Sequence, residues 1–256
     1  LIQRDDSFDE FIQTGNKKDK IALTIFHLFA NGIVTNRDAW CYNASKTKLS
    51  NSIQLFLNTY NSEVDRFHAK SGEVPDASSF VTNDTTKIKW SSSLLPKLIS
   101  GKKLIFDKNQ ITNSVYRPFE KRCLYYDNDL NHRVSLNRSI FPEKDMPNKV
   151  IAVSGMGAKE FTTLMTDTIP DLQLMFNGQC FPLKLYEKED PNKKQPDIFT
   201  EQNNGVNEYT VKDGITDAAL QHFRSAYPNE DISKEDIFYY IYGLLHSEEY
   251  RAKYAD

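Results

Sequence analysis

The chain has 256 residues, of which 39% are hydrophobic and 26% charged, and its formal net charge is −3. This composition is typical of a folded protein with one large domain or two small ones. No apolar run reaches the roughly 20 residues that span a bilayer, and no basic-then-apolar leader is present. We therefore expect a cytoplasmic protein with no membrane partner. The sequence opens on Leu1, and we interpret it as a segment of a longer polypeptide.

The cysteines give no indication of a metal site. Cys41, Cys123 and Cys180 are far apart in the sequence, and no C-x-x-C or H-x-x-x-H pair occurs. Structural zinc sites use such closely spaced ligands. We expect free, mostly buried thiols and no bound metal.

The first part of the chain favours helices. Residues 8–30 read as a helix interrupted at Gly15 and ended by Asn31-Gly32. Apolar residues repeat every three or four positions over residues 51–70, which predicts an amphipathic helix. Residues 73–90 are typical of a loop, and the serines at 91–93 can cap a short helix that runs through Ile99.

From residue 102 the pattern changes to short apolar runs separated by turn sequences, which predicts strands. These runs cover residues 104–106, 115–117, 123–126 and 150–153. The segments 172–176 and 180–183 flank Asn177-Gly178, which predicts a strand pair around a tight turn. Residues 187–214 are polar and acidic, and we expect a long surface loop or hinge.

The last forty residues return to helical patterns. Thr216 can cap a helix through Tyr227, and Ser233 with Asp236 forms a capping box. The whole pattern predicts an α+β (mixed α/β) fold, in which a small twisted mixed sheet is flanked by helical N-terminal and C-terminal parts.

Known catalytic motifs are missing. The chain has no phosphate-binding P-loop, no G-x-S-x-G serine-hydrolase elbow and no [N/D]-P-P-[Y/F] tetrapeptide of an adenine methyltransferase. Ser154-Gly155-Met156-Gly157 suggests a nucleotide or AdoMet loop, but Glu160 stands where the third glycine of the motif belongs. A tight turn is the favoured interpretation. We predict no catalytic or cofactor-binding residue, and hence no enzyme activity for this chain alone.

The segment from Tyr116 to Tyr126 holds three cations and four aromatics in eleven residues. Cations can neutralise phosphates and flat rings can stack on bases. The alternative is a strand with an aromatic inner face and charges that point to water. The surrounding residues 101–150 hold ten Lys/Arg against six Asp/Glu, which suggests a surface that faces a polyanion.

Several segments in the same order resemble the C-terminal portion of Type ISP restriction–modification enzymes. They are residues 32–40 (GIVTNRDAW), 116–119 (YRPF) with 121–122 and 125–126, 169–172 (IPDL), 179–183 (QCFPL) and 236–247 (DIFYYIYGLLHS). The resemblance runs from about residue 20 to the end of the chain. In that family a nuclease, a helicase motor and an N6-adenine DNA methyltransferase precede a target-recognition domain.

The resemblance implies that residues 73–256 form the target-recognition domain, with a C-terminal helical pair over about 215–256. Residues 1–72 would be a helical junction or the end of the methyltransferase region. It also implies double-stranded DNA and an upstream methyltransferase domain of the same polypeptide as partners, and AdoMet and ATP as cofactors of the parent protein. The cofactors would bind outside this chain.

The function that the resemblance implies is recognition of a DNA sequence, so that other domains can methylate adenine at N6 and restrict the DNA. The alternative is a protein–protein or interdomain docking module without direct DNA contact. We expect the tyrosines and Phe119 of the 116–126 segment to pack in the core, and the loop 127–139 to read bases. The candidate DNA-binding residues are Arg117, Lys121, Arg122, Arg133, Asn137 and Arg138.

Overall fold

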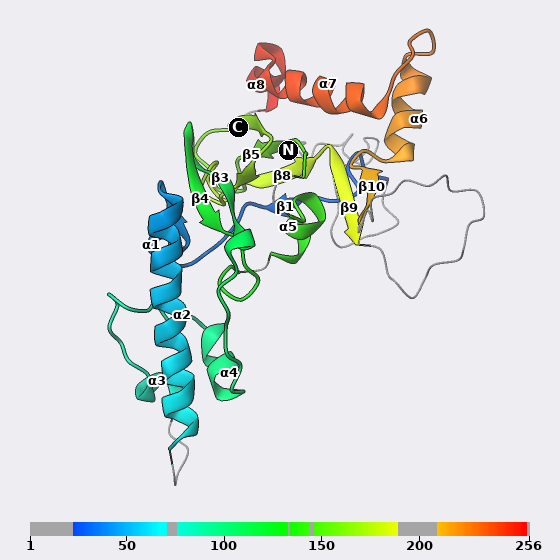
Figure 1. The fold of residues 1–256 in the computed structure, drawn as a ribbon. Coiled ribbons are helices and arrows are strands. Elements are labelled where there is room, and N and C mark those ends of the chain that lie inside the picture. The colour runs from blue at the N-terminus through cyan, green and yellow to red at the C-terminus, as the bar shows by residue number, and fades with distance from the viewer. Residues whose placement is uncertain (1–22, 71–75, 133, 144–145, 189–208, 255–256) are drawn as a thin grey trace, which may run out of the picture.

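The structure of the protein is a computed structural model that describes residues 23–70, 76–132, 134–143, 146–188 and 209–254 (Figure 1). The helices are α1 (Asp38–Cys41), α2 (Lys46–His68), α3 (Ala77–Phe80), α4 (Leu94–Ile99), α5 (Ser135–Ile140), α6 (Asp217–Ala226), α7 (Lys234–His246) and α8 (Glu248–Tyr254). The strands are β1 (Ala30–Asn31), β2 (Tyr42–Asn43), β3 (Ile111–Arg117), β4 (Glu120–Tyr125), β5 (Val150–Val153), β6 (Thr163–Thr166), β7 (Ile169–Pro170), β8 (Gln179–Pro182), β9 (Lys184–Lys188) and β10 (Tyr209–Asp213).

The predicted α+β class is confirmed, and the described strands divide into two four-stranded sheets and a two-stranded ribbon. One sheet has the order β1-β8-β5-β6 and the other the order β2-β4-β3-β7, while β9 pairs with β10. The β3–β7 pair is parallel, and the other strand pairs are antiparallel.

Strand β5 separates two hydrophobic cores. All of its residues are buried, and successive side chains in a strand point to opposite faces. Val150 and Ala152 therefore belong to the larger core, whereas Ile151 and Val153 belong to the second core, under α6 and α7. This accounts for an apolar run without polar alternation, because neither face of β5 meets water.

Helix α2 packs its apolar face on the sheet that contains β3 and β4. Ser45 begins the helix by accepting a hydrogen bond from the backbone N of Lys48. Ile53, Phe56 and Tyr60 are fully buried in the same core as Leu124 of β4. Residues before and after position 72 both contribute to this core. The predicted domain boundary at that position stays a prediction.

The C-terminal helices begin where their caps predict. The Thr216 side chain accepts from Ala219 N, and Ser233 and Asp236 form the reciprocal capping box. Ile237, Phe238 and Leu245 of α7 are buried in the second core. Figure 1 shows α7 and α8 lying across the end of the molecule next to β5 and β8.

Some local predictions are wrong because pairing with distant segments overrides local pattern. Residues 23–31 are not helical: Phe26 forms a β-bridge with Ile215, and β1 pairs with β8. The remainder of the predicted 8–30 helix lies outside the described residues.

Residues 172–176 form turns instead of a strand. Their expected partner, β8, pairs with β1 on one side and with β5 on the other. Residues 104–106 are not a strand either. The ends of the expected 187–214 loop belong to β9 and β10, and residues 189–208 lie outside the described part of the chain.

Candidate nucleic-acid interface

The 116–126 segment forms the turn of the β3–β4 hairpin and its second strand. Arg117 pairs with Glu120, so Pro118 and Phe119 make a two-residue turn. Neighbouring strands support only the base of the hairpin, because β2 pairs at residues 123–124 and β7 at residues 114–115. Residues 116–122 therefore form a two-stranded ribbon beside the first turn of α2 (Figure 1).

The aromatic residues of this segment differ in burial. Tyr125 and Tyr126 are buried in the larger core as expected. The expectation that Phe119 packs there is wrong, because its side chain is 97% exposed. The turn places Phe119 at the tip of the ribbon, beyond the strands that cover the core.

The hairpin cations lie on two faces. Lys121 pairs with Val115 and Arg122 with Ser114, so their side chains point to opposite sides. The guanidinium groups of Arg122 and Arg117 lie 4.3 and 3.9 Å from the Tyr116 ring centroid. Both are thus held on the Tyr116 side, while Lys121 stands on the other.

Each of these cations has a carboxylate neighbour. Arg117 Nη1 donates to Asp171 Oδ1 at 2.6 Å, and Arg122 Nε donates to Glu120 Oε1 at 2.6 Å. Lys121 lies 4.0 Å from Asp167, and both of these side chains are more than two-thirds exposed. An exposed pair of this kind contributes about 0–1 kcal/mol, so Lys121 can readily exchange its partner for a phosphate.

The candidates on α5 make internal contacts. Asn137 is buried and donates to the Asn31 carbonyl oxygen at 2.7 Å. Arg138 donates to the Tyr126 carbonyl at 2.5 Å and to Gln110 Oε1 at 2.9 Å, with its guanidinium over the Tyr126 ring. These bonds explain both residues structurally, and their DNA contact stays a prediction. Arg133 lies outside the described residues.

Sequence reasoning missed Lys46 and Lys48, which lie exposed in the first turn of α2. Asn43 pairs with Cys123, which brings this turn alongside the outer part of β4. The first turn of α2 contains no acidic residue, although a helix N-terminus favours anions over cations. Two lysines at that position were the sequence signal that an anionic partner could bind there.

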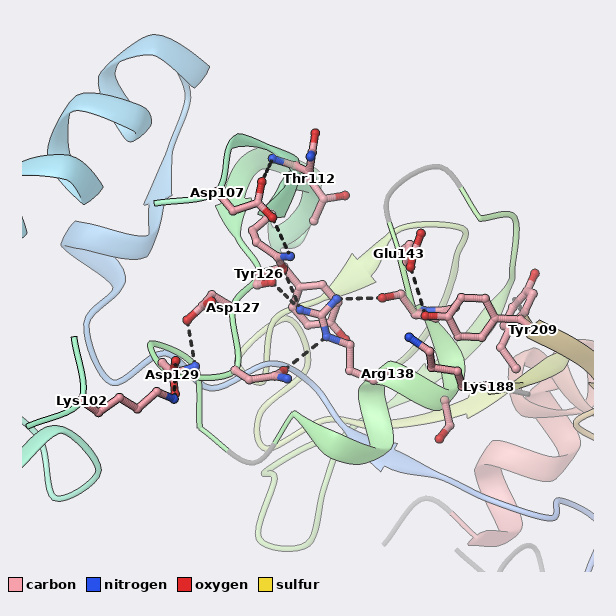
Figure 2. A pocket seen from close by; sticks show the side chains of 16 residues that line it. Lys102, Asp107, Thr112, Tyr126, Asp127, Asp129, Arg138, Glu143, Lys188 and Tyr209 are labelled. Atoms are coloured by element: carbon pink, nitrogen blue, oxygen red, sulfur yellow. Dashed lines mark hydrogen bonds and ion pairs between the residues drawn. The ribbon is translucent and has the colours of Figure 1, made fainter. Parts of the chain in front are cut away.

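A polar cleft of about 890 Å³ opens at the other end of the hairpin (Figure 2). Its lining comes from Asp107 and the 3-10 helix Lys108–Gln110 that follows it, from loop residues 127–129, from helix α5 and from the β9–β10 ribbon. The Asp127 carboxyl accepts from the backbone N of Asp129 and of Leu130, and burial raises its pKa. Lys102 pairs with Asp129 across the rim, and Tyr209 donates to Glu143 at 3.1 Å.

Two further hollows continue this cleft along β3 to the hairpin tip. The next one, about 470 Å³, shares Thr112 and Glu143 with the cleft. The last one, about 580 Å³, shares Lys149 and Asp167 with its neighbour and reaches Phe119. The three hollows thus share lining residues in turn and carry mixed charge, and we call them together the β3 groove.

The chemistry of the β3 groove suits base edges better than phosphates. The cleft end carries the side-chain amides of Asn109, Gln110 and Asn128, and amides can make bidentate hydrogen bonds to adenine. Carboxylates such as Asp107 and Glu143 can accept from the amino group of cytosine. The expectation that the loop 127–139 reads bases is consistent with this position and stays a prediction.

The glycine segment 154–157 is a turn, as predicted. Gly155 N donates to the Phe176 carbonyl, and a Cβ at Gly155 would meet Asn177 O at 2.2 Å. No helix begins within the next five residues, so this loop does not present the helix N-terminus that a pyrophosphate site uses. Close backbone packing explains why residue 155 is a glycine.

No described helix is long and apolar enough to cross a membrane. Within the same residues, no three His, Cys, Asp or Glu side chains gather into a possible metal site. The α+β body, exposed cationic hairpin and polar groove have the features of a macromolecule-binding module. The family model of the Type ISP C-terminal specificity domain matches residues 24–256, and the chain therefore belongs to that family.

Solved structures agree with the family assignment. The DrdV–DNA complex, solved by cryo-EM, has a TM-score of 0.76 and 32% identity over 91% of this chain and 20% of that chain. A nuclease-deletion mutant of the Type ISP restriction–modification enzyme LlaGI, in complex with a DNA substrate mimic, has a TM-score of 0.76 and 32% identity over 99% of this chain and 21% of that chain.

The ATP-dependent Type ISP restriction–modification enzyme LlaBIII bound to DNA has a TM-score of 0.77 and 27% identity over 97% of this chain and 15% of that chain. The chain thus spans only about a fifth of the length of these proteins or less. Comparison with curated proteins gives no match.

Proposed function

We propose that this chain recognises a specific sequence in duplex DNA and positions it for adenine N6 methylation and restriction by other domains of one polypeptide. The observation that carries this proposal is the match of nearly the whole chain to Type ISP enzymes bound to DNA. The match supports a binding role for this chain, and in this proposal other domains of the parent polypeptide carry out catalysis.

The contacts divide by chemistry. Lys121, Lys46 and Lys48 are exposed around the hairpin, and they would hold phosphates without reading sequence. Arg117 and Arg122 lie on the Tyr116 face of the hairpin, opposite Lys121. The β3 groove would read base edges through its amide, hydroxyl and carboxylate groups. Arg138 lines the cleft end of the groove, and Asn137 precedes it on α5. Arg133, which lies outside the described residues, completes the proposed contact set.

The remaining parts of the proposal concern the parent polypeptide. An upstream methyltransferase domain would bind AdoMet, and a motor domain would bind ATP. The turn at residues 154–157 does not lead into a helix whose N-terminus could bind a phosphate, which supports placing both cofactors outside this chain.

Selection from a pool of duplexes with a randomised centre tests the proposal. The 256-residue chain is mixed with the pool, and bound duplexes are sequenced over several rounds. We expect one short motif to be enriched, and enrichment to be lost at high salt because phosphate contacts release counterions. A cooperative unfolding transition would show that the chain is folded. If such a chain enriches no sequence, the result would contradict the proposed function.

Docking without DNA contact is the second candidate, and the outer side of α7 favours it. Tyr240 is half exposed and Tyr239 is 36% exposed, whereas Phe238, which precedes them in α7, is buried. Aromatic side chains of this kind are common at protein interfaces. Replacing Tyr240 with Ser separates the two functions, because docking would weaken while motif selection by the chain would not change.

A further inference from the structure

The tip of the β3–β4 hairpin carries a residue in an unfavourable conformation. Phe119 has a φ of +62°, a region that residues with a Cβ rarely adopt. The other described non-glycine residues with positive φ are Asn36 and Asn177, and asparagine tolerates this region well. Phe119 is therefore the one of these three residues whose side chain does not suit a positive φ.

The turn itself calls for a different residue. Proline fixes its own φ near −65°, and a following residue with positive φ gives the pattern of a type II turn. Glycine is the usual choice at that second position, because it has no Cβ. A phenylalanine there costs on the order of 1–2 kcal/mol.

Packing does not compensate for this strain within the described residues. The Phe119 side chain is 97% exposed, although it is one of the residues that line the last hollow of the β3 groove, with Leu164 and Met165. Backbone strain concentrates at functional sites. A strained and exposed aromatic ring therefore indicates a function outside the fold of this chain.

We propose that Phe119 is a wedge that inserts between stacked base pairs of the bound duplex. The inference deepens the proposed function and rests on it. Two-stranded ribbons fit a DNA groove, and apolar side chains that enter the stack unstack a base step and bend the duplex. Residues 116–122 have that ribbon form, and Pro118-Phe119 is their exposed apolar tip.

Charge around the tip favours DNA over an apolar protein surface. Lys121 follows the turn by two residues and is 68% exposed, while Lys46 and Lys48 lie in the neighbouring first turn of α2. Among the described residues neither Lys46 nor Lys48 has an ion-pair partner. These cations stand where the phosphates on either side of an opened base step would pass.

Insertion of Phe119 would also contribute to recognition of the DNA sequence. Unstacking cost depends on sequence, since pyrimidine–purine steps open most readily. Phe119 would thus select a deformable step without hydrogen bonding to it, next to the bases that the β3 groove reads directly. The prediction is that the enriched motif contains such a step at one fixed position.

The test uses the duplex selected by the chain, with 2-aminopurine replacing one adenine at a time. This base fluoresces more strongly when it is unstacked. The wild-type chain is compared with Phe119→Gly, which suits the positive φ, and with Phe119→Trp, which keeps a flat ring. Ile105→Ala is the matched control, since Ile105 is 86% exposed. Its neighbour Leu104 is hydrogen-bonded to Asn61 of α2, roughly 20 Å along the helix from its first turn.

We expect fluorescence to rise at one position with the wild-type chain, with Phe119→Trp and with Ile105→Ala. With Phe119→Gly the rise disappears and binding weakens about tenfold, although the urea midpoint does not fall. A Phe119→Gly chain with unchanged affinity and fluorescence would overturn the wedge and leave Phe119 to contact another protein domain. If the wild-type chain selects no sequence at all, the proposed function fails as well.

Discussion

Arg117 Nη1 donates to Asp171 Oδ1 at 2.6 Å, which ties the end of β3 to the residue after β7. Asp171 is 4% exposed and Arg117 is 33% exposed. The backbone N of Asp171 also donates to the Val115 carbonyl oxygen. One side chain of the cationic hairpin therefore holds the fold together as well as facing outward.

Replacing Arg117 with Ala should lower the free energy of unfolding at pH 7 by about 2–3 kcal/mol, because it leaves a buried carboxylate unpaired. Burial already raises the pKa of Asp171, and losing Arg117 raises it further. A raised carboxyl pKa favours the protonated folded state at low pH and costs stability as the pH rises through it. The loss should thus grow between pH 4 and pH 7 in urea titrations.

The variant Arg117→Ala with Asp171→Asn is the control. It removes the unpaired charge, so its stability should vary less with pH than that of Arg117→Ala. Equal losses for the single variant at pH 4 and pH 7 would contradict the role of the Asp171 carboxylate.

Gly214 and Gly243 offer opposite tests of the same substitution. A Cβ at Gly214 would meet the Pro182 carbonyl oxygen at 1.9 Å, so Gly214→Ala should destabilise the chain by more than about 3 kcal/mol or prevent folding. Gly243 is inside α7 with open space around it. Gly243→Ala should therefore raise stability by about 0.5–1 kcal/mol, and thermal unfolding would measure both. A neutral Gly214→Ala would refute this close approach between residues 182 and 214.

Arg138 should matter for stability more than its position in the polar cleft suggests. It bonds to Tyr126 O, Gln110 Oε1 and Pro142 O, and lysine cannot reproduce a forked set of donors. We expect Arg138→Ala and Arg138→Lys to lower the free energy of unfolding by about 2 kcal/mol each in urea. Full recovery in the lysine variant would show that charge alone suffices.

The elements that were predictable carry their signals locally. Ser233 and Asp236 specify a helix start within four residues, and α2 repeats its apolar positions over its whole length. Residues 23–30 carry the same kind of apolar density, yet they are extended because His27 N donates to Gly214 O and β1 pairs with β8. Those partners lie more than 140 residues away in sequence, where no local pattern reaches.

The candidate site was predictable in the same uneven way. The cation-rich segment at 116–126 was visible as composition, and the structure makes it a ribbon next to the β3 groove. That Lys121 and Arg122 point apart follows from their register, and that Phe119 is exposed follows from the turn at Arg117 and Glu120. Both facts depend on where β4 begins, which a run of charges and aromatics does not specify.

Phosphate contacts should appear in the salt dependence of binding. We expect the triple variant Lys46→Ala, Lys48→Ala, Lys121→Ala to bind duplex DNA more weakly and to flatten the plot of log affinity against log salt by about 0.9 per lost contact. Lys70→Ala is the control, because Lys70 follows the opposite end of α2, roughly 30 Å away along its axis. An unchanged slope in a folded triple variant would remove these lysines from the interface.

The ratio of affinities for the selected duplex and for a scrambled duplex of the same composition tests sequence recognition most directly. Fluorescence anisotropy with the 256-residue chain at fixed salt would give both values. We predict a ratio on the order of a thousand or more, as for other sequence-specific DNA-binding proteins. A ratio near one, with tight binding to both duplexes, would contradict a recognition function.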